Sequence, residues 1–571
     1  MERKSYQHST RVGRRRLLAA AGSGVAGVAL LACSSRGKSR QSSAPSSTGA
    51  QSAESPQRGG TYATYVQYNA ILDPHKAQAG AQTVIGGVYG RVFRFTTGTD
   101  PKVFTDHNIE PDLGLSAESP DAVTWTVKLR PDAKFQIVAP VNGHAVEAED
   151  IKATFVRALD PATNNQNRGS LSMIDSAQIQ TPDKSTLVFK LNYAYAPFRK
   201  LLASPAYSLI FPREVLTGGY DPSKTAIGSG PFMLESFTPD VAYVYKRNAD
   251  WFEKGRPYVD GIKMVITADA SAQLAQFTAG NLDELTIVNP FDVDAAQKSN
   301  PKAKVTKSLD GRPFPLYLQL GDRGGAFMDV RVRRAASMAI DRDAIAKVIY
   351  NGQGFNTAFI PAYMGAWATV IDKLDPSIQQ WFKYNPAESK KLLEAAGQTN
   401  LTLRLAYISG AAYTTPPYVK TAETLANMLT AAGIKTSVIT HDNNKDYVDA
   451  GKGSRQGYFE KDVLIFSGIP ADTDADQSLY SNFHSKSNTN AEHLSDPKLD
   501  AMIDKERTLV NEDDRLKAVQ EIGRYMADQM FVIPTPGSYT WVLTNPRVHD
   551  FSYTNDLAKF TENYAKIWIK D

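Results

Sequence analysis

Hydrophobic and polar residues follow two different periods along this chain, and both occur throughout its length. Residues 123–129 and 241–245 alternate apolar and polar positions and are rich in Val, Tyr and Thr, which predicts β-strands. Residues 329–348 place apolar side chains three and four positions apart, which predicts an amphipathic helix. Further helices are predicted at 386–396, 497–506 and 513–528. Mixed helices and strands without a repeat of about 20–50 residues argue against an all-β shell or a helical solenoid.

The apolar run at the N-terminus belongs to a different kind of segment. Residues 1–16 contain six basic residues and one acidic residue, and residues 17–32 are almost all Leu, Ala, Val and Gly. The apolar run at 17–32 is shorter than the roughly 20 residues that span a bilayer. A basic segment followed by a short apolar run is typical of a secretory signal peptide. Residues 30–33 (LLAC) resemble a bacterial lipobox, which implies cleavage before Cys33 and lipidation of its thiol. The arginines at 14–16 also resemble a twin-arginine signal, so the export route stays open.

Composition narrows the classes of function. Residues 34–58 are rich in Ser, Gly, Gln and Pro, which predicts a disordered tether with a reach of roughly 25–30 Å. The formal net charge of +4 becomes −1 once the net +5 of residues 1–32 is removed, which excludes a basic nucleic-acid-binding surface. Cys33 is the only cysteine, so the exported body has neither a disulfide nor a thiolate metal site.

Several short motifs follow one another in order along the chain. They are found at 59–62 (GGTY), 72–75 (LDPH), 125–135 (WTVKLRPDAKF), 143–151 (GHAVEAEDI), 228–232 (GSGPF), 247–251, 327–342 and 384–397. Each motif is weak alone, but together and in this order they resemble the family 5 extracellular solute-binding proteins of bacterial ABC importers. Members of this family bind peptides, nickel or opines.

The resemblance implies an α/β fold of the type II periplasmic-binding-protein kind. Two lobes are joined by a hinge, and a large extra domain is inserted into the first lobe. The expected division is a signal peptide at 1–32, a lipidated tether at 33–58, lobe I at 59–103, 228–310 and 537–571, an inserted domain at 104–227, and lobe II at 311–536. The solute is expected to bind in the cleft between the lobes.

The segment 466–476 follows an apolar strand and carries the main candidate ligand residues. In the family's peptide binders, the matching segment supplies an aspartate that pairs with the α-ammonium group of the peptide. An alignment without a gap places the glycine of that motif at Gly468 and its aspartate at Asp472. A buried ammonium group needs such a carboxylate, although a loop cap is the alternative role for Asp472. The neighbouring candidates are Ser467, Ala471 and Ile469, the last in place of the family's tryptophan.

Aromatic residues supply the remaining candidate contacts. Tyr68 and Asn69 come just after the first predicted strand, and Tyr317 and Trp367 are further candidates for the cleft wall. For each aromatic ring, packing in a hydrophobic core is the alternative. Residues 472–476 also resemble the start of a calcium loop, but the required Gly and Glu are replaced by Gln477 and Phe483.

Two classes of function compete. A secreted hydrolase would need a nucleophile or a metal motif, but the chain has no H-E-x-x-H or G-x-S-x-G motif. The eight histidines are scattered, with no two of them three or four positions apart. We therefore expect no enzyme activity, no cofactor and no metal site.

The favoured function is a lipid-anchored substrate-binding component of an ABC importer. We expect it to capture a solute, with an oligopeptide as the favoured ligand, and to deliver it to permease subunits. An oligosaccharide or a metal chelate is the alternative ligand, and a receptor for an extracellular peptide signal is the alternative role. The expected location is the outer face of the cytoplasmic membrane, where a monomer is held only by its lipid and contacts no nucleic acid.

Overall fold

The computed structural model describes residues 55–570 with short gaps. The gaps are at 77–81, 98–104, 166, 310–313, 322–323, 357, 411–414, 448–452, 455–456, 469–473, 488–489 and 553–563. The predicted signal peptide and Cys33 therefore lie outside the described residues. Gly49–Asp571 make up one compact unit of the chain. Among the described helices, none combines the length and the hydropathy that crossing a membrane would require.

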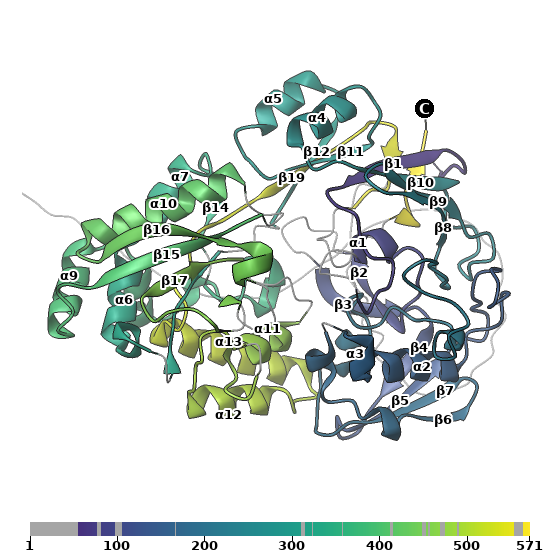
Figure 1. Ribbon diagram of the computed structural model, residues 1–571, viewed down its shortest axis with the longest axis horizontal. Helices are drawn as coiled ribbons and strands as arrows, with labels where there is room; N and C mark the ends of the chain where they lie inside the picture. The colour runs from purple at the N-terminus through teal and green to yellow at the C-terminus, as the bar shows by residue number, and fades with distance from the viewer. Residues whose placement is uncertain are drawn as a thin grey trace, which may run out of the picture. The chain divides into compact units, whose positions relative to one another are not determined.

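Two sheets define the part of the molecule that we call lobe I (Figure 1). The first has the strands β1 (Thr61–Val66), β10 (Gly261–Ile266), β9 (Ala242–Arg247) and β8 (Phe232–Thr238), in that order. The second has the strands β11 (Glu284–Ile287), β19 (Thr540–Thr544) and β12 (Lys304–Ser308). The helices α4 (Ala270–Thr278) and α5 (Val293–Ser299) bury Phe277 and Val293 against the second sheet. Strand β19 is the central strand of this sheet, so a C-terminal segment completes lobe I.

An antiparallel sheet with a helix packed on it forms what we call the inserted domain. Its strands are β4 (Gly114–Glu118), β5 (Thr124–Leu129), β7 (Thr186–Lys190) and β6 (Gln180–Asp183), in that order. Phe155 of α2 (Ala148–Leu159) packs edge-on against Phe189 of β7, with 5.3 Å between the ring centroids. Trp251 and Phe252 of lobe I join the same core. The inserted domain and lobe I therefore share buried apolar side chains.

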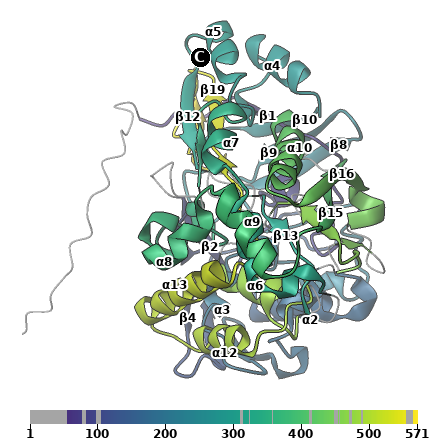
Figure 2. The same cartoon turned by 90° about the vertical axis from the view of Figure 1, so that its left-hand side faces the viewer.

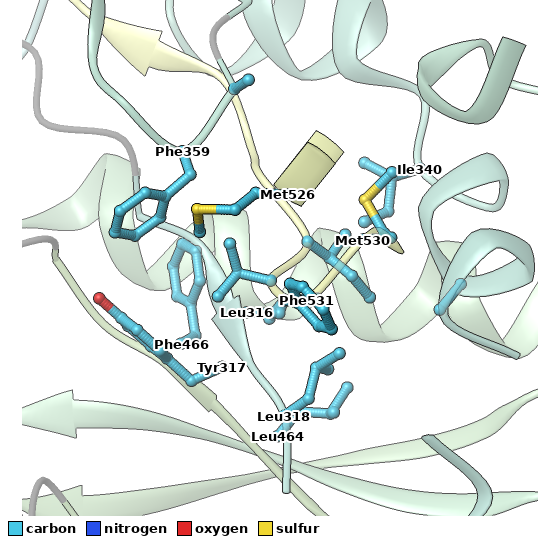
Figure 3. Close-up of a cluster of buried hydrophobic side chains, with 14 of the residues drawn as sticks. Leu316, Tyr317, Leu318, Ile340, Phe359, Leu464, Phe466, Met526, Met530 and Phe531 are labelled. Atoms are coloured by element: carbon cyan, nitrogen blue, oxygen red, sulfur yellow. The ribbon is translucent and has the colours of Figure 1, made fainter. Parts of the chain in front are cut away.

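A third body, which we call lobe II, is built around a mixed sheet. Its strands are β13 (Leu316–Tyr317), β17 (Val463–Phe466), β15 (Thr402–Ser409) and β16 (Lys435–Asp442), in that order. Strand β15 runs parallel to both of its neighbours, whereas β13 is antiparallel to β17. All four residues of β17 are buried, as expected for a continuous apolar strand inside a sheet. Side chains such as Leu316, Phe466 and Phe531 meet in its core (Figure 3).

Most of the helices belong to lobe II. They are α6 (Val330–Met338), α7 (Arg342–Val348), α8 (Pro376–Gln379), α9 (Pro386–Ala395), α10 (Pro416–Ala431), α11 (Ala475–Phe483), α12 (Pro497–Glu506) and α13 (Glu512–Gln529). Helices α12 and α13 lie side by side in both views (Figure 1, Figure 2). The remaining short elements are α1 (Gln82–Ile85), α3 (Phe198–Leu201), β2 (Phe93–Thr97), β3 (Thr105–Pro111), β14 (Gly354–Phe355), β18 (Gly537–Ser538), β20 (Val548–His549) and β21 (Trp568–Ile569).

The periodic segments form the elements that their patterns predict, with one exception. Strands β5 and β9 confirm the two predicted strands, and α9, α12 and α13 confirm three predicted helices. The prediction of a single helix at 329–348 is wrong, because the structure has two helices there, α6 and α7. The side chain of Asp341 accepts a hydrogen bond from the backbone N–H of Ala344 and so caps a second helix. The apolar spacing continues through the break, which is why the pattern alone does not reveal it.

Candidate functional site

The predicted ligand segment begins where the central strand β17 of lobe II ends. Ile469, Ala471 and Asp472 lie outside the described residues, so the described part of the segment is Ser467 and Gly468. The buried hydroxyl of Ser467 donates a hydrogen bond of 2.6 Å to the hydroxyl of Tyr447. The structure therefore fixes the start of the segment and leaves the role of Asp472 a prediction.

An aromatic cluster holds this end of β17 in place. The ring of Tyr418, on α10, stacks on Phe466 with 4.9 Å between centroids. Its hydroxyl donates to the carbonyl oxygen of Phe466 and accepts from the backbone N–H of Ile408, on the neighbouring strand β15. Phe314 packs on both rings, and a Cβ at Gly468 would come within 3.2 Å of it. A side chain at position 468 would thus crowd this ring, which accounts for glycine there.

The other sequence-predicted contacts lie in different surroundings. Tyr317, on β13, is in the core of lobe II near Phe359 and Phe466 (Figure 3). Tyr68 is partly exposed just beyond β1. The side-chain amide of Asn69 donates to the carboxylate of Asp240 at 2.6 Å and accepts from its backbone N–H at 2.9 Å. Their roles in binding a solute stay predictions.

Trp367 lies close to two cations that come from different parts of the molecule. Its ring is 4.6 Å from the ammonium nitrogen of Lys200, in α3 of the inserted domain, and 4.9 Å from the guanidinium carbon of Arg515, in α13. Both cations are at cation–π distance from the ring. Trp367 is thus part of the contact between the inserted domain and lobe II.

A buried cluster of charges extends from Trp367 to the first residue after the gap in the ligand segment. Asp474 caps α11, forms a two-pronged ion pair with Arg515, and lies 3.7 Å from Lys200. Arg515 also donates to Glu506 at 2.9 Å, and Lys200 reaches Glu512 at 2.8 Å. Paired charges of this kind tolerate burial, whereas an unpaired one is strongly unfavourable.

A second arginine joins the same two parts of the molecule. Arg507 forms an ion pair of 2.9 Å with Asp476, and its guanidinium carbon is 3.9 Å from the ring of Tyr480. On the other side it faces Tyr193 and Tyr195 of the inserted domain, at 5.1 Å and 4.9 Å. Its backbone carbonyl accepts a hydrogen bond of 2.7 Å from Ala196. We call Lys200, Asp474, Asp476, Glu506, Arg507 and Arg515 the ionic junction.

The protonation of the ionic junction follows from burial and from pairing. Burial alone would raise the pKa of Asp474, but the charges of Arg515 and Lys200 hold it well below the usual range. Burial raises the pKa of Glu506 well above its ordinary value, and the negative charges of Asp476 and Asp474 raise it further. The positive charge of Arg515 opposes these effects but does not cancel them. Arg515 and Lys200 therefore stabilise the charged form of Asp474, whereas burial dominates at Glu506.

Comparison with known proteins gives the family. The model of the bacterial extracellular solute-binding proteins, family 5 (middle segment), matches residues 108–490. The chain therefore belongs to this family.

Relatives and solved structures extend the match over most of the chain. Heme-binding protein A of Haemophilus influenzae is 26% identical over 482 residues, which cover 81% of this chain and 84% of that protein. Di/tripeptide-binding protein 2 of Pseudomonas aeruginosa is 25% identical, with 73% of this chain and 78% of that protein covered. The ABC transporter substrate-binding protein CtaP of Listeria monocytogenes has the same fold, with a TM-score of 0.74, 19% identity, and 90% of this chain and all of that one covered.

These matches confirm the fold and the class of function that the motifs implied. The molecule is an α/β protein of the type II periplasmic-binding kind, with two lobes and a large extra domain. Its function is to bind a solute for an ABC transporter, as the family does. The family consists of substrate-binding proteins of transporters rather than of enzymes.

Proposed function

We propose that this protein binds an oligopeptide between its lobes and delivers it unaltered to the permease subunits of an ABC importer. The observation that supports this ligand is the position of Ser467 and Gly468, directly after a buried strand whose end is fixed by Tyr418 and Phe314. In the sequence, Asp472 follows four residues after Gly468. The similarity to a di/tripeptide-binding protein agrees with it. In this proposal, Asp472 pairs with the α-ammonium group of the peptide.

The proposed division into lobes follows the pairing of the strands. Strand β12 pairs with β19 in lobe I, whereas the next strand, β13, pairs with β17 in lobe II. We place the first crossing between residues 308 and 316, and the return between β18, which pairs with β14, and β19. Bending at these two crossings would close both lobes on the ligand. Because the ligand then contacts both lobes only in the closed state, its binding favours that state.

Calorimetry with Asp472→Ala tests the proposed contact. The probe is trialanine with free termini, titrated into residues 49–571. Loss of a carboxylate that pairs with a buried ammonium group should weaken binding by roughly 2–5 kcal/mol. Asp221→Ala is the matched control, because that aspartate is on the surface of the inserted domain and pairs with Ser223 and Lys224. Equal affinity of both variants would disprove the role of Asp472.

A metal chelate is the second candidate ligand, because one of the relatives is a heme-binding protein. Titration with hemin in place of the peptide separates the two candidates. Binding of hemin with no binding of peptide would replace the oligopeptide proposal.

The membrane anchor is proposed at Cys33, from the lipobox-like residues 30–33. It would hold a monomer on the outer face of the cytoplasmic membrane by its lipid alone. Cys33→Ser should move the full chain from the membrane fraction to the soluble fraction of expressing cells. Continued membrane association of this variant would contradict the anchor.

A further inference from the structure

Three side chains that can ligate a metal converge in the inserted domain, away from the ionic junction. They are His144, Asp150 and Glu214, and one ligand atom of each lies within 4.8 Å of the other two. His144 comes just before the isolated bridge between Ala145 and Lys134, Asp150 is in the first turn of α2, and Glu214 is in a short 3-10 helix, Arg213–Val215. No sequence spacing predicts this group, because each ligand comes from a different segment.

The ring of His144 is oriented as a metal ligand would be. Its Nδ1 is 2.8 Å from the backbone carbonyl oxygen of Ala145. A carbonyl oxygen only accepts, so Nδ1 carries the hydrogen, and a neutral ring then has its lone pair on Nε2. Histidines that bind metals through one nitrogen commonly donate the other N–H to a backbone carbonyl.

The other ring nitrogen, Nε2, faces a carboxylate at equal distances. Nε2 of His144 is 3.3 Å from both carboxylate oxygens of Glu214. Two lone pairs facing each other need a cation between them, either a proton or a metal ion. For zinc, bonds of about 2.0–2.1 Å to nitrogen and about 2.0–2.2 Å to oxygen place tetrahedral ligand atoms about 3.4 Å apart. The observed separation fits that geometry.

Asp150 provides a rigid third ligand. Its side chain is fully buried, and its two oxygens accept hydrogen bonds from the backbone N–H groups of Glu147 at 2.8 Å and Arg213 at 3.0 Å. Nε of Arg213 also lies 3.3 Å from Oδ1, so Oδ2 is the oxygen that keeps a second lone pair for a further partner. The backbone bonds therefore fix the orientation of the carboxylate and leave it able to ligate.

The local charge favours an additional cation. Glu147, Asp150 and Glu214 are three carboxylates around the single guanidinium of Arg213, which bonds Glu147 at 2.9 Å and lies 3.3 Å from Asp150. Lys184 also reaches Glu147, but its side chain is 85% exposed. Arg213 thus pairs with Glu147 and Asp150, and Glu214 faces the ring of His144.

We propose that His144, Glu214 and Asp150 bind a divalent transition-metal ion such as Zn²⁺, with water completing the coordination. Imidazole suits zinc, nickel and copper, and zinc also takes Asp and Glu oxygens as ligands. The ion would join three segments of the inserted domain and would be separate from the solute. The proposal does not depend on the identity of the solute.

Calorimetric titration of chelator-treated residues 49–571 with ZnCl₂ tests the site. We expect one binding event that is at least about tenfold weaker in His144→Gln and in Glu214→Gln, since loss of outer-shell partners alone weakens metal affinity by about 10–100-fold. His441→Gln is the matched control, because that half-buried histidine of lobe II bonds Ser454. It should bind zinc as the wild type does. Circular dichroism without metal verifies that each variant is folded.

Two results would overturn the proposal. If the wild type binds no zinc, the contact between His144 and Glu214 is an ion pair of a protonated ring. If zinc binds equally well to both site variants, the ion occupies another place in the molecule, such as the solute cleft.

Discussion

The core of lobe II and the ionic junction both bury large side chains, but with opposite chemistry. In the core, Phe466, Leu316 and Phe531 pack among apolar neighbours (Figure 3). In the junction, six charged residues are each at least nine-tenths buried, and Lys200 reaches them from the inserted domain. Separating the halves of the core would expose apolar surface to water, whereas separating the junction would expose charges that water solvates. Separating the inserted domain from lobe II should therefore cost less free energy than unfolding lobe II.

The largest expected effect is in the core. Phe466→Ala removes a fully buried ring that stacks on Tyr418, and it should lower the free energy of unfolding by about 3–5 kcal/mol. Urea unfolding followed by circular dichroism measures the change. Tyr384→Ala is the control, because half of that side chain is exposed and its removal should cost no more than about 0.5 kcal/mol. Similar losses in both variants would mean that the ring of Phe466 is not part of a packed core.

Removing an arginine of the ionic junction should have the next largest effect. Arg515→Met leaves Asp474 with only Lys200 and leaves Glu506 without its cation, which should cost about 3 kcal/mol in the same urea experiment. A loss below about 1 kcal/mol would show that water reaches these charges.

The pH dependence of Arg515→Met sharpens this comparison. In the wild type, the lowered pKa of Asp474 stabilises the fold above the ordinary aspartate pKa of about 3.9, and this contribution is lost only as the pH falls through the lower folded-state value. Without Arg515, burial raises that pKa, so acidification protonates the unpaired carboxylates. The difference in stability between variant and wild type should shrink from pH 7 to pH 5, whereas the effect of Phe466→Ala should stay constant. A difference that grows with acidification would contradict this assignment.

The smallest effect is expected for Lys200, the cation that reaches the ionic junction from the inserted domain. Lys200→Met keeps the apolar stem beside Trp367 and leaves Asp474 paired with Arg515, so the loss should be about 1–2 kcal/mol, the size of one desolvated cation–π contact. Tryptophan fluorescence should nevertheless change, because the charge beside Trp367 is gone. Lys184→Met, at an exposed lysine of the same domain, should change neither signal. An unchanged fluorescence in Lys200→Met would show that Lys200 does not contact Trp367 in solution.

Local signals in the sequence predict the elements better than they predict the site. The alternation at β5 and the Asn385 cap of α9 are encoded within a few residues, and both elements form as predicted. The break between α6 and α7 depends on one capping side chain, Asp341, within an uninterrupted apolar pattern. Such a cap is visible in the sequence but competes there with a stronger periodic signal.

The ionic junction could not be predicted from local patterns. Lys200 and Glu512 are 312 positions apart, and nothing in their neighbouring residues relates one to the other. In the sequence, Asp474 and Asp476 stand out only as part of an incomplete calcium loop. The structure gives each of them an arginine partner instead. Such pairs become visible only once the fold is known, because the fold brings distant charges together.

Identification of the molecule that the protein carries tests the central claim most directly. Residues 49–571, purified without added ligand and then denatured, should release a small molecule that mass spectrometry identifies as a peptide with a free amino terminus. The same peptide, added back, should bind once per chain and be recovered unchanged. Recovery of a chemically altered peptide, or of a different class of molecule such as heme, would contradict the account.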